Sequence, residues 1–391
     1  MRILHTADNH IGETDYQRID SQTGMNARGL DFLNSFKKIA DKAIEERVDV
    51  LLIAGDFFTK VNPHPRYLLE VIRKLKQVSK AGITTLIITG NHETPRIATT
   101  LNPLLVLGET EGIIVVLEPA TVSLKGYDFV CVPAPPNFDE MKNLFGPMLT
   151  QAMKDSKSDH KILVAHLPLG QAVTSSEQTL ESFIGDTVDV RQIPSKFDYV
   201  ALGHMHKFQK VPHDSMPIYY PGSSERHEFG EEGDEKFAIM VEFSDGSKVS
   251  PIKLTTRPMV TLVDADCRGL SATKISKLVL DRIEQEKNNV ADTLVRIKLE
   301  NIDVDENRVI DWKQIKSKLQ EANVFDYKLQ PRTVVSLPES KGLGGEYVLP
   351  PSKEVELYIK GRSQYKGKTE LMMKLANEII REAKEAMPSE A

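Results

Sequence analysis

The sequence has few cysteines and no long hydrophobic segment. Its two cysteines, Cys131 and Cys267, lie far apart and in no metal-binding spacing, so neither a disulfide framework nor a zinc ribbon is supported. No apolar run approaches the length of a membrane span, and the first residues do not follow the pattern of a secretion signal. We therefore expect a cytoplasmic protein in a reducing compartment, with no membrane contact.

An excess of positive charge is also absent. Lysine and arginine number 50 against 56 aspartates and glutamates, which gives a net charge of −6. This balance disfavours a generally basic nucleic-acid binder but is compatible with a local basic groove. The length of 391 residues predicts two or three domains. We place them at residues 1–255, 256–335 and 336–391.

The sequence does contain a repeated pattern of apolar runs that end in polar side chains. Val48 to Ala54 is such a run, and it stops at Gly55-Asp56. Runs rich in Ile, Val and Leu and bounded by Gly are typical of strands buried on both faces. Ligands gather at the carboxyl ends of such strands. Five runs of this kind predict one shared rim that carries Asp8, His10, Asp56, Asn91, His92, His166, His204 and His206.

The side chains expected at this rim indicate a metal site. Carboxylate, amide and imidazole donors without a thiolate suit Mn²⁺, Fe or Zn²⁺. One ion takes about four protein ligands, so the set predicts two ions with Asp56 as the shared ligand. Two such ions promote hydrolysis of a phosphate ester. His92 directly follows Asn91, and its ring either contacts the phosphate, acts as a general acid, or supports a ligand through a hydrogen bond.

Helical spacing of apolar residues predicts several helices around these strands. One covers residues 30–44, and two more cover 65–78 and 97–107. The apolar positions of the latter two exceed one face, which indicates either core burial or a dimer contact. Beyond a glycine-rich linker at 336–351, an amphipathic helix at 371–387 either docks on a partner or packs on the body.

Five motifs, taken in order, resemble those of the calcineurin-like metallophosphoesterases. They are Asp8-Asn9-His10, Gly55-Asp56, Gly90-Asn91-His92-Glu93, His166 and Gly203-His204-Met205-His206. The resemblance implies an α/β fold, a double-sheet α/β sandwich followed by a small α+β capping domain and a C-terminal helical segment. It also implies one metal held by Asp8, His10, Asp56 and His206, and a second held by Asp56, Asn91, His166 and His204.

Further residues resemble the SbcD-type double-strand-break repair nucleases, especially their archaeal members. These are the segment 3–12, Tyr16, Arg28 and Tyr220-Pro221-Gly222-Ser223-Ser224-Glu225. The resemblance implies a nuclease with two Mn²⁺ per chain, acting as a 3′ to 5′ double-strand exonuclease and a single-strand endonuclease. DNA would be contacted by Tyr16 and Arg28, and His92 would be catalytic.

The same resemblance implies two protein partners. The helices at 65–78 and 97–107 would form a homodimer, and the C-terminal segment would bind a coiled-coil ABC-type ATPase of the SbcC type. Two features depart from the family: Thr59 stands where bacterial relatives often have a histidine, and residues 19–25 lengthen a DNA-facing loop.

Two other functions fit the motifs. The first is a small-molecule or cyclic-nucleotide phosphodiesterase of the same superfamily, which the capping module and terminal helix disfavour. The second is a DNA-tethering scaffold, which the complete set of ligand positions disfavours. We therefore expect a nucleoid-associated repair nuclease of the cytoplasm.

Overall fold

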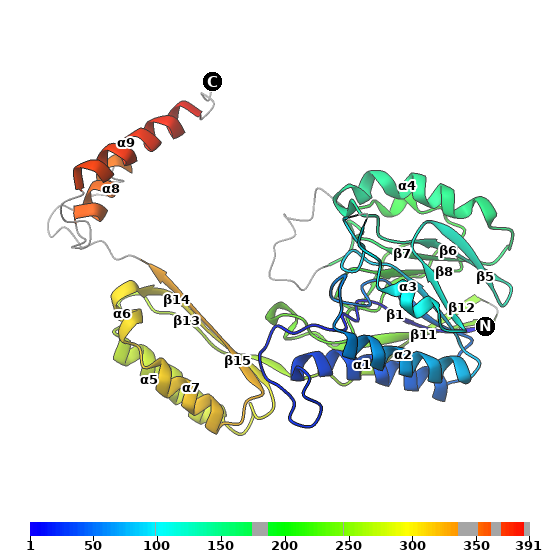
Figure 1. Cartoon of the computed structure of the whole chain (residues 1–391), viewed down its shortest axis with the longest axis horizontal. Helices are drawn as coiled ribbons and strands as arrows, with labels where there is room; N and C mark the ends of the chain where they lie inside the picture. Colours follow the sequence, from blue (N-terminus) through cyan, green and yellow to red (C-terminus); the bar gives the residue numbers. More distant parts are fainter. Residues whose placement is uncertain (98, 174–186, 245, 335–350, 361–368, 387–391) are drawn as a thin grey trace. The chain divides into compact units, whose positions relative to one another are not determined.

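Two six-stranded mixed sheets form the first part of the chain (Figure 1). The computed structural model describes residues 1–97, 99–173, 187–244, 246–334, 351–360 and 369–386. The first sheet has the order β12-β11-β1-β2-β3-β4. Its strands are β1 (Arg2–Thr6), β2 (Val50–Ala54), β3 (Thr84–Ile88), β4 (Ile113–Val116), β11 (Lys236–Ser244) and β12 (Gly246–Leu254).

The second sheet has the order β5-β6-β7-β8-β10-β9. In each sheet four neighbouring strands run parallel: β1 to β4 in the first, and β6, β7, β8 and β10 in the second. The strands of the second sheet are β5 (Ala120–Leu124), β6 (Tyr127–Val132), β7 (Lys161–His166), β8 (Tyr199–Gly203), β9 (Gln209–Val211) and β10 (Ile218–Tyr220).

Helices cover the outer faces of both sheets. Buried side chains of α1 (Ala27–Glu45) and α2 (Pro65–Lys80) share one apolar cluster with the first sheet. Those of α4 (Met141–Ala152) share another with the second sheet. A third cluster lies between the sheets and combines residues from both. The result is the double-sheet α/β sandwich that the resemblance implies.

Local sequence explains where these helices begin. The side chain of Asn26 accepts a hydrogen bond from the backbone N–H of Gly29 at 2.9 Å and so caps α1. Pro65 is the first residue of α2, where its missing N–H costs nothing. Both helices extend a few residues beyond the predicted ranges of 30–44 and 65–78.

The helix expected over 97–107 is wrong in its extent, because α3 covers only Leu104–Gly108. Pro103 disfavours a helical backbone at Asn102. The Asn102 side chain accepts a hydrogen bond from the N–H of Leu104 at 2.9 Å and donates one to Thr89 Oγ1 at 3.0 Å. These bonds anchor the start of α3, and turns replace the expected helix before it.

A third sheet has the order β13-β14-β15. It consists of β13 (Met259–Asp266), β14 (Leu294–Asp303) and β15 (Asp326–Val334), accompanied by α5 (Ala272–Glu286), α6 (Val304–Val309) and α7 (Trp312–Glu321). The side chain of Asp311 caps α7 by accepting a hydrogen bond from the backbone N–H of Gln314. The linker expected at 336–351 lies almost wholly outside the described residues. Two helices, α8 (Pro351–Lys360) and α9 (Thr369–Ala386), follow.

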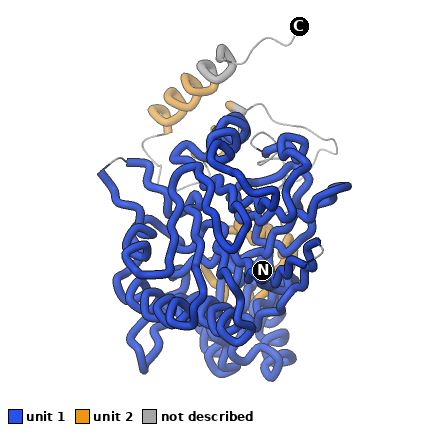
Figure 2. The backbone as a smooth tube through the Cα atoms, turned by 90° about the vertical axis from the view of Figure 1, so that its right-hand side faces the viewer, with its two compact units in different colours: residues 1–265, 276–298, 311–330 blue, residues 266–275, 299–310, 331–391 orange. Residues whose placement is uncertain are grey.

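The chain divides into two compact units, coloured separately in Figure 2. The first comprises residues 1–265, 276–298 and 311–330, and the second comprises 266–275, 299–310 and 331–391. The three-domain division at 255 and 335 stays a prediction. None of the helices in the described ranges is both long and apolar enough to cross a membrane.

Candidate metal centre

The carboxyl ends of five parallel strands carry the predicted side chains. Asp8 and His10 follow β1, Asp56 follows β2, and Asn91 with His92 follows β3. In the facing sheet His166 ends β7, and His204 and His206 follow β8. Because parallel strands of both sheets end at this rim, residues far apart in sequence come together there.

Four of these residues adopt a backbone conformation that is unusual for non-glycine residues. The φ angle is +49° at Asp8, +42° at His10, +47° at Asp56 and +99° at His204. Left-handed angles of this kind are strained, and such strain concentrates at functional sites. The rest of the fold therefore holds these turns in conformations that aim the side chains at one place.

Glycines allow the loops to approach one another closely at this rim. A β-carbon on Gly90 would lie 2.1 Å from Asp56 Oδ1, and one on Gly203 would lie 2.0 Å from the Ala54 carbonyl oxygen. Neither position tolerates a side chain. The two motifs thus need glycine for space rather than for turn geometry.

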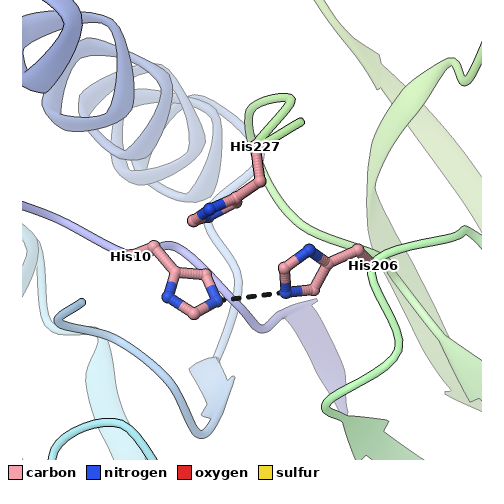
Figure 3. A group of neighbouring side chains, drawn as sticks. All are labelled: His10, His206 and His227. Carbon is pink, nitrogen blue, oxygen red and sulfur yellow. Dashed lines mark hydrogen bonds between the residues drawn. The ribbon is translucent and has the colours of Figure 1, made fainter. Parts of the chain in front are cut away.

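One side of the centre is formed by two histidines and a carboxylate. The Nε2 atoms of His10 and His206 lie 3.1 Å apart (Figure 3). His10 Nε2 also lies 3.9 Å from Asp56 Oδ2. Two imidazole lone pairs this close repel unless a proton or a cation lies between them. The carboxylate of Asp8 accepts the backbone N–H of His204, with both oxygens at 3.0 Å.

The other side is formed around His166. Its Nδ1 donates to the Ala54 carbonyl oxygen at 2.9 Å, which leaves Nε2 facing the centre. That Nε2 lies 3.2 Å from Asp56 Oδ2 and 3.1 Å from Asn91 Oδ1. His204 Nδ1 lies 3.2 Å from the same Asn91 oxygen. Asp56 thus contacts both sides of the centre, through His10 on one and His166 on the other.

Burial and close packing shift the acidity of the groups at the centre. Burial alone would raise the pKa of Asp56, but His166, His10 and His92 outweigh it and hold that pKa well below its usual range. Burial would lower the pKa of His166, whereas Asp56 and Asp8 raise it to about 9. Burial raises the pKa of Asp8 to about 6. A negative Asp56 at neutral pH is the consequence.

These donors fit divalent cations. Two groups of ligand atoms share Asp56, one with His10 and His92 and the other with His166 and His204. Within each group the ligand atoms lie no more than 4.8 Å apart. Their donors are nitrogen and oxygen without sulfur, which suits Mn²⁺, Fe²⁺ or Zn²⁺. The geometry is therefore that of a His/Asp site consistent with two divalent metals.

His92 stands apart from the buried ligands because its side chain is 46% exposed. Its backbone N–H donates to Asp56 Oδ1 at 2.9 Å, and its Nδ1 lies 3.2 Å from the Thr59 carbonyl oxygen. A carbonyl accepts only, so Nδ1 carries the proton and Nε2 faces the centre, 3.9 Å from Asp56 Oδ2. This ring can reach both the centre and a substrate.

A buried network holds His206 from behind. His206 Nδ1 is 2.8 Å from Glu231 Oε1, and Glu231 Oε2 is 2.5 Å from the Lys236 ammonium. Lys236 also donates to the His206 carbonyl oxygen at 3.0 Å. A carboxylate behind an imidazole fixes its tautomer and orientation. Glu231 was missed in the sequence because it follows no predicted strand end.

The two predicted DNA contacts differ in accessibility. Tyr16 is partly buried beside Phe229, Met259 and Phe325. Arg28 is 1% exposed and pairs with Asp31 at 2.9 Å and with Glu225 at 3.5 Å. The guanidinium of Arg28 is thus engaged inside the protein, and its contact with DNA stays a prediction. His227 was also missed, although it closely follows the motif at 220–225.

Comparison with known proteins agrees with this geometry. The family model for calcineurin-like phosphoesterases matches residues 1–208. "DNA double-strand break repair protein Mre11" from Saccharolobus solfataricus is 29% identical over 264 residues, which is 66% of this chain and 65% of that protein. The protein of the same name from Methanosarcina mazei is 28% identical over 66% of this chain and 39% of its own. The SbcD component of the nuclease SbcCD from Bacillus subtilis is 28% identical, covering 64% and 68%.

The chain therefore belongs to the calcineurin-like phosphoesterases, whose family model covers more than half of it. The five motifs and their convergence in space agree with that membership. Within this family it is a metallophosphoesterase of the group formed by Mre11 and SbcD. It spans 65% of the length of the first archaeal relative and 39% of the second.

Proposed function

We propose that the chain is a nuclease that processes DNA ends in double-strand break repair. The observation that carries this proposal is the convergence of histidines and aspartates from five strands on a centre shared by Asp56. Relatives named for double-strand break repair support DNA as the substrate class. We infer 3′ to 5′ exonuclease action on duplex ends and endonuclease action on single strands, in the nucleoid region of the cytoplasm.

The residues divide into two ligand sets. Asp8, His10, Asp56 and His206 would hold one cation, which we infer to be Mn²⁺. The second Mn²⁺ would be held by Asp56, Asn91, His166 and His204. Two bound cations would supply a polarised phosphodiester and an activated water at neutral pH.

His92 would donate a proton from Nε2 to the leaving oxygen when both of its ring nitrogens carry a proton. The Thr59 carbonyl fixes its Nδ1, and Nε2 faces the site from an exposed position. A group within hydrogen-bond reach of the reacting oxygen contributes about 10²- to 10⁴-fold as a general acid. We propose that His92 is a catalytic residue.

An open hollow of about 590 Å³ beside His92 supports an extended substrate. It is lined by Asn62, Asn91, His92, Arg96 and Thr100, among others. Arg96 gives it a positive charge of the kind that contacts phosphates. Tyr16 is a further candidate for DNA contact, through its exposed part.

Two partners follow from the apolar surfaces that the described residues leave exposed. Ile97 and Leu101 are 66% and 64% exposed, and Leu69 of α2 is 47% exposed. We propose a homodimer through this surface.

On α9, Leu371 and Ile379 are 62% and 64% exposed, which supports docking of a coiled-coil ABC-type ATPase on the segment 336–391. Residues 256–335 would form a capping domain.

End-labelled duplex DNA with Mn²⁺ provides the test. We expect shortening from 3′ ends by the wild type, a 10²- to 10⁴-fold slower reaction for His92→Ala, and no measurable reaction for Asp56→Asn or after chelation by EDTA. Bis-p-nitrophenyl phosphate should follow the same order.

The matched control is His160→Ala, which removes an exposed histidine paired with Asp198. It should cleave DNA like the wild type. Hydrolysis of the small ester without DNA cleavage would support a small-molecule phosphodiesterase instead. Binding of DNA without hydrolysis of either substrate would support a scaffold.

A further inference from the structure

His227 brings a third imidazole to the side of the centre formed by His10 and His206 (Figure 3). Its ring centroid lies 4.1 Å from that of His10 and 4.8 Å from that of His206. Nitrogen atoms from all three rings lie within 4.8 Å of one another. None of the five motifs includes this residue.

The surroundings of His227 leave one nitrogen available. Its Nδ1 lies 3.9 Å from Glu13 Oε2, and a carboxylate on that side favours the proton on Nδ1. Among the described residues its buried Nε2 has no hydrogen-bond partner. Glu231 lies on the corresponding side of His206, at the shorter distance of 2.8 Å from its Nδ1. A carboxylate behind an imidazole whose other nitrogen is free is the usual setting of a metal-binding histidine.

We propose that His227 is an additional ligand for the cation on the His10 side, so that three imidazoles bind it. This inference rests on the two-cation centre of the proposed function. Two nitrogens on one ion lie at most about 4.2 Å apart, twice a metal–nitrogen bond. The ligand atoms of His10, His206 and His227, within 4.8 Å of one another, are close to that spacing.

A third imidazole changes which metal this side prefers. Imidazole nitrogen suits Zn²⁺ and other late first-row ions, whereas Mn²⁺ is served better by carboxylate and water. His227 therefore increases the affinity for Co²⁺ or Zn²⁺ more than the affinity for Mn²⁺. The other side, with Asn91 in place of a third imidazole, lacks this preference.

Packing alone is the competing role for His227. Its ring also contacts Phe32 edge to face, with centroids 4.8 Å apart. His227→Phe retains a ring of similar size and removes both nitrogens, so it separates packing from ligation. His160→Phe is the matched control, because His160 lies beside Tyr127 and Asp198.

Titration of the full-length, metal-depleted protein with Co²⁺ tests the inference. Calorimetry measures the affinity, and visible absorption reports the coordination of the bound ion. We expect two Co²⁺ per wild-type chain. His227→Phe should bind one of them about 10- to 100-fold more weakly, with an altered visible spectrum and a smaller loss for Mn²⁺. Unchanged Co²⁺ affinity and spectrum would overturn the inference, and fewer than two Co²⁺ in the wild type would instead overturn the proposed centre.

A second variant gives a positive signal if His227→Phe folds poorly. His227→Cys places a thiolate at the same position, and a thiolate bound to Co²⁺ produces an intense charge-transfer band. The native thiols of Cys131 and Cys267 are buried, so the wild type should lack this band. Its absence in a folded His227→Cys protein with two bound Co²⁺ would show that residue 227 does not reach the ion.

Discussion

Asp128, on β6, is a single carboxylate with four hydrogen-bond donors. Ser123 and Ser156 donate through their hydroxyls at 2.6 and 3.0 Å, and the N–H groups of Lys157 and Ser158 donate at 2.7 and 2.8 Å. Burial alone would raise its pKa, but these donors lower the pKa to about 2. The charged carboxylate therefore stabilises the turn at 156–158.

The Asp128→Asn variant should lose about 2 kcal/mol of unfolding free energy at pH 7, because the unfolded pKa is about 4. A depressed folded pKa contributes stability above the unfolded pKa, and this contribution disappears as pH falls from about 4 to about 2. The difference between variant and wild type should thus be about half as large at pH 3. Urea unfolding at both pH values measures it.

The exposed Asp139 provides the control for this comparison. Asp139→Asn should leave the unfolding free energy within about 0.5 kcal/mol of the wild type at both pH values. A loss for Asp128→Asn that is equally large at pH 7 and pH 3 would refute the electrostatic explanation and leave only the changed shape of the side chain.

At the level of elements, Arg28 fixes the first turn of α1 to the loop after β10. It pairs with Asp31 of the same helix and with the buried Glu225, donates to the carbonyl oxygen of Arg226, and stacks on Phe32. Removing one partner of a buried ion pair costs about 3 to 5 kcal/mol. We expect a loss of that size for Arg28→Ala in urea unfolding at neutral pH.

Arg73 provides the comparison for this variant. Its side chain on α2 is 63% exposed and pairs with Glu70 at the surface, so Arg73→Ala should cost less than about 1 kcal/mol. If Arg28 only joins α1 to the loop after β10, Arg28→Ala should also leave the salt dependence of DNA binding unchanged. A folded Arg28→Ala protein with a shallower salt dependence would support the predicted contact of Arg28 with phosphate.

What the sequence predicts at this scale depends on the range of the interactions involved. Strand ends could be located because parallel strands terminate at one rim, and that alone brings His166 and Asp56 together. The start of α3 could not be located from the sequence, because it depends on a hydrogen bond between Asn102 and Thr89 that exists only after folding. The same holds for His227, whose neighbours come from distant loops and follow no periodic pattern.

For the whole molecule, the exposed leucines before and within α3 predict self-association. Leu101 and Leu105 are 64% and 40% exposed, and exposed apolar patches mark interaction surfaces. Replacing both by Asp would bury charges in the proposed homodimer interface. Sedimentation velocity should change from a dimer for the wild type to a monomer for the double variant, with the unfolding free energy changed by less than about 1 kcal/mol.

Leu278 on α5 is the matched position, since it is 38% exposed in another part of the fold. Leu278→Asp should remain dimeric. A wild-type monomer at micromolar concentration, or a dimer that survives both aspartates, would exclude this surface as the interface.

The candidate centre is complete only with residues from late in the sequence. His10 and His206 lie 3.1 Å apart although 196 positions separate them, and Glu231 and Lys236, which hold His206, come later still. On the ribosome, a growing chain that has only the first sheet's opening strands has no complete ligand set. The proposed hydrolysis of a phosphodiester would thus require the second sheet, and an unfinished product of translation would not cleave nearby nucleic acid.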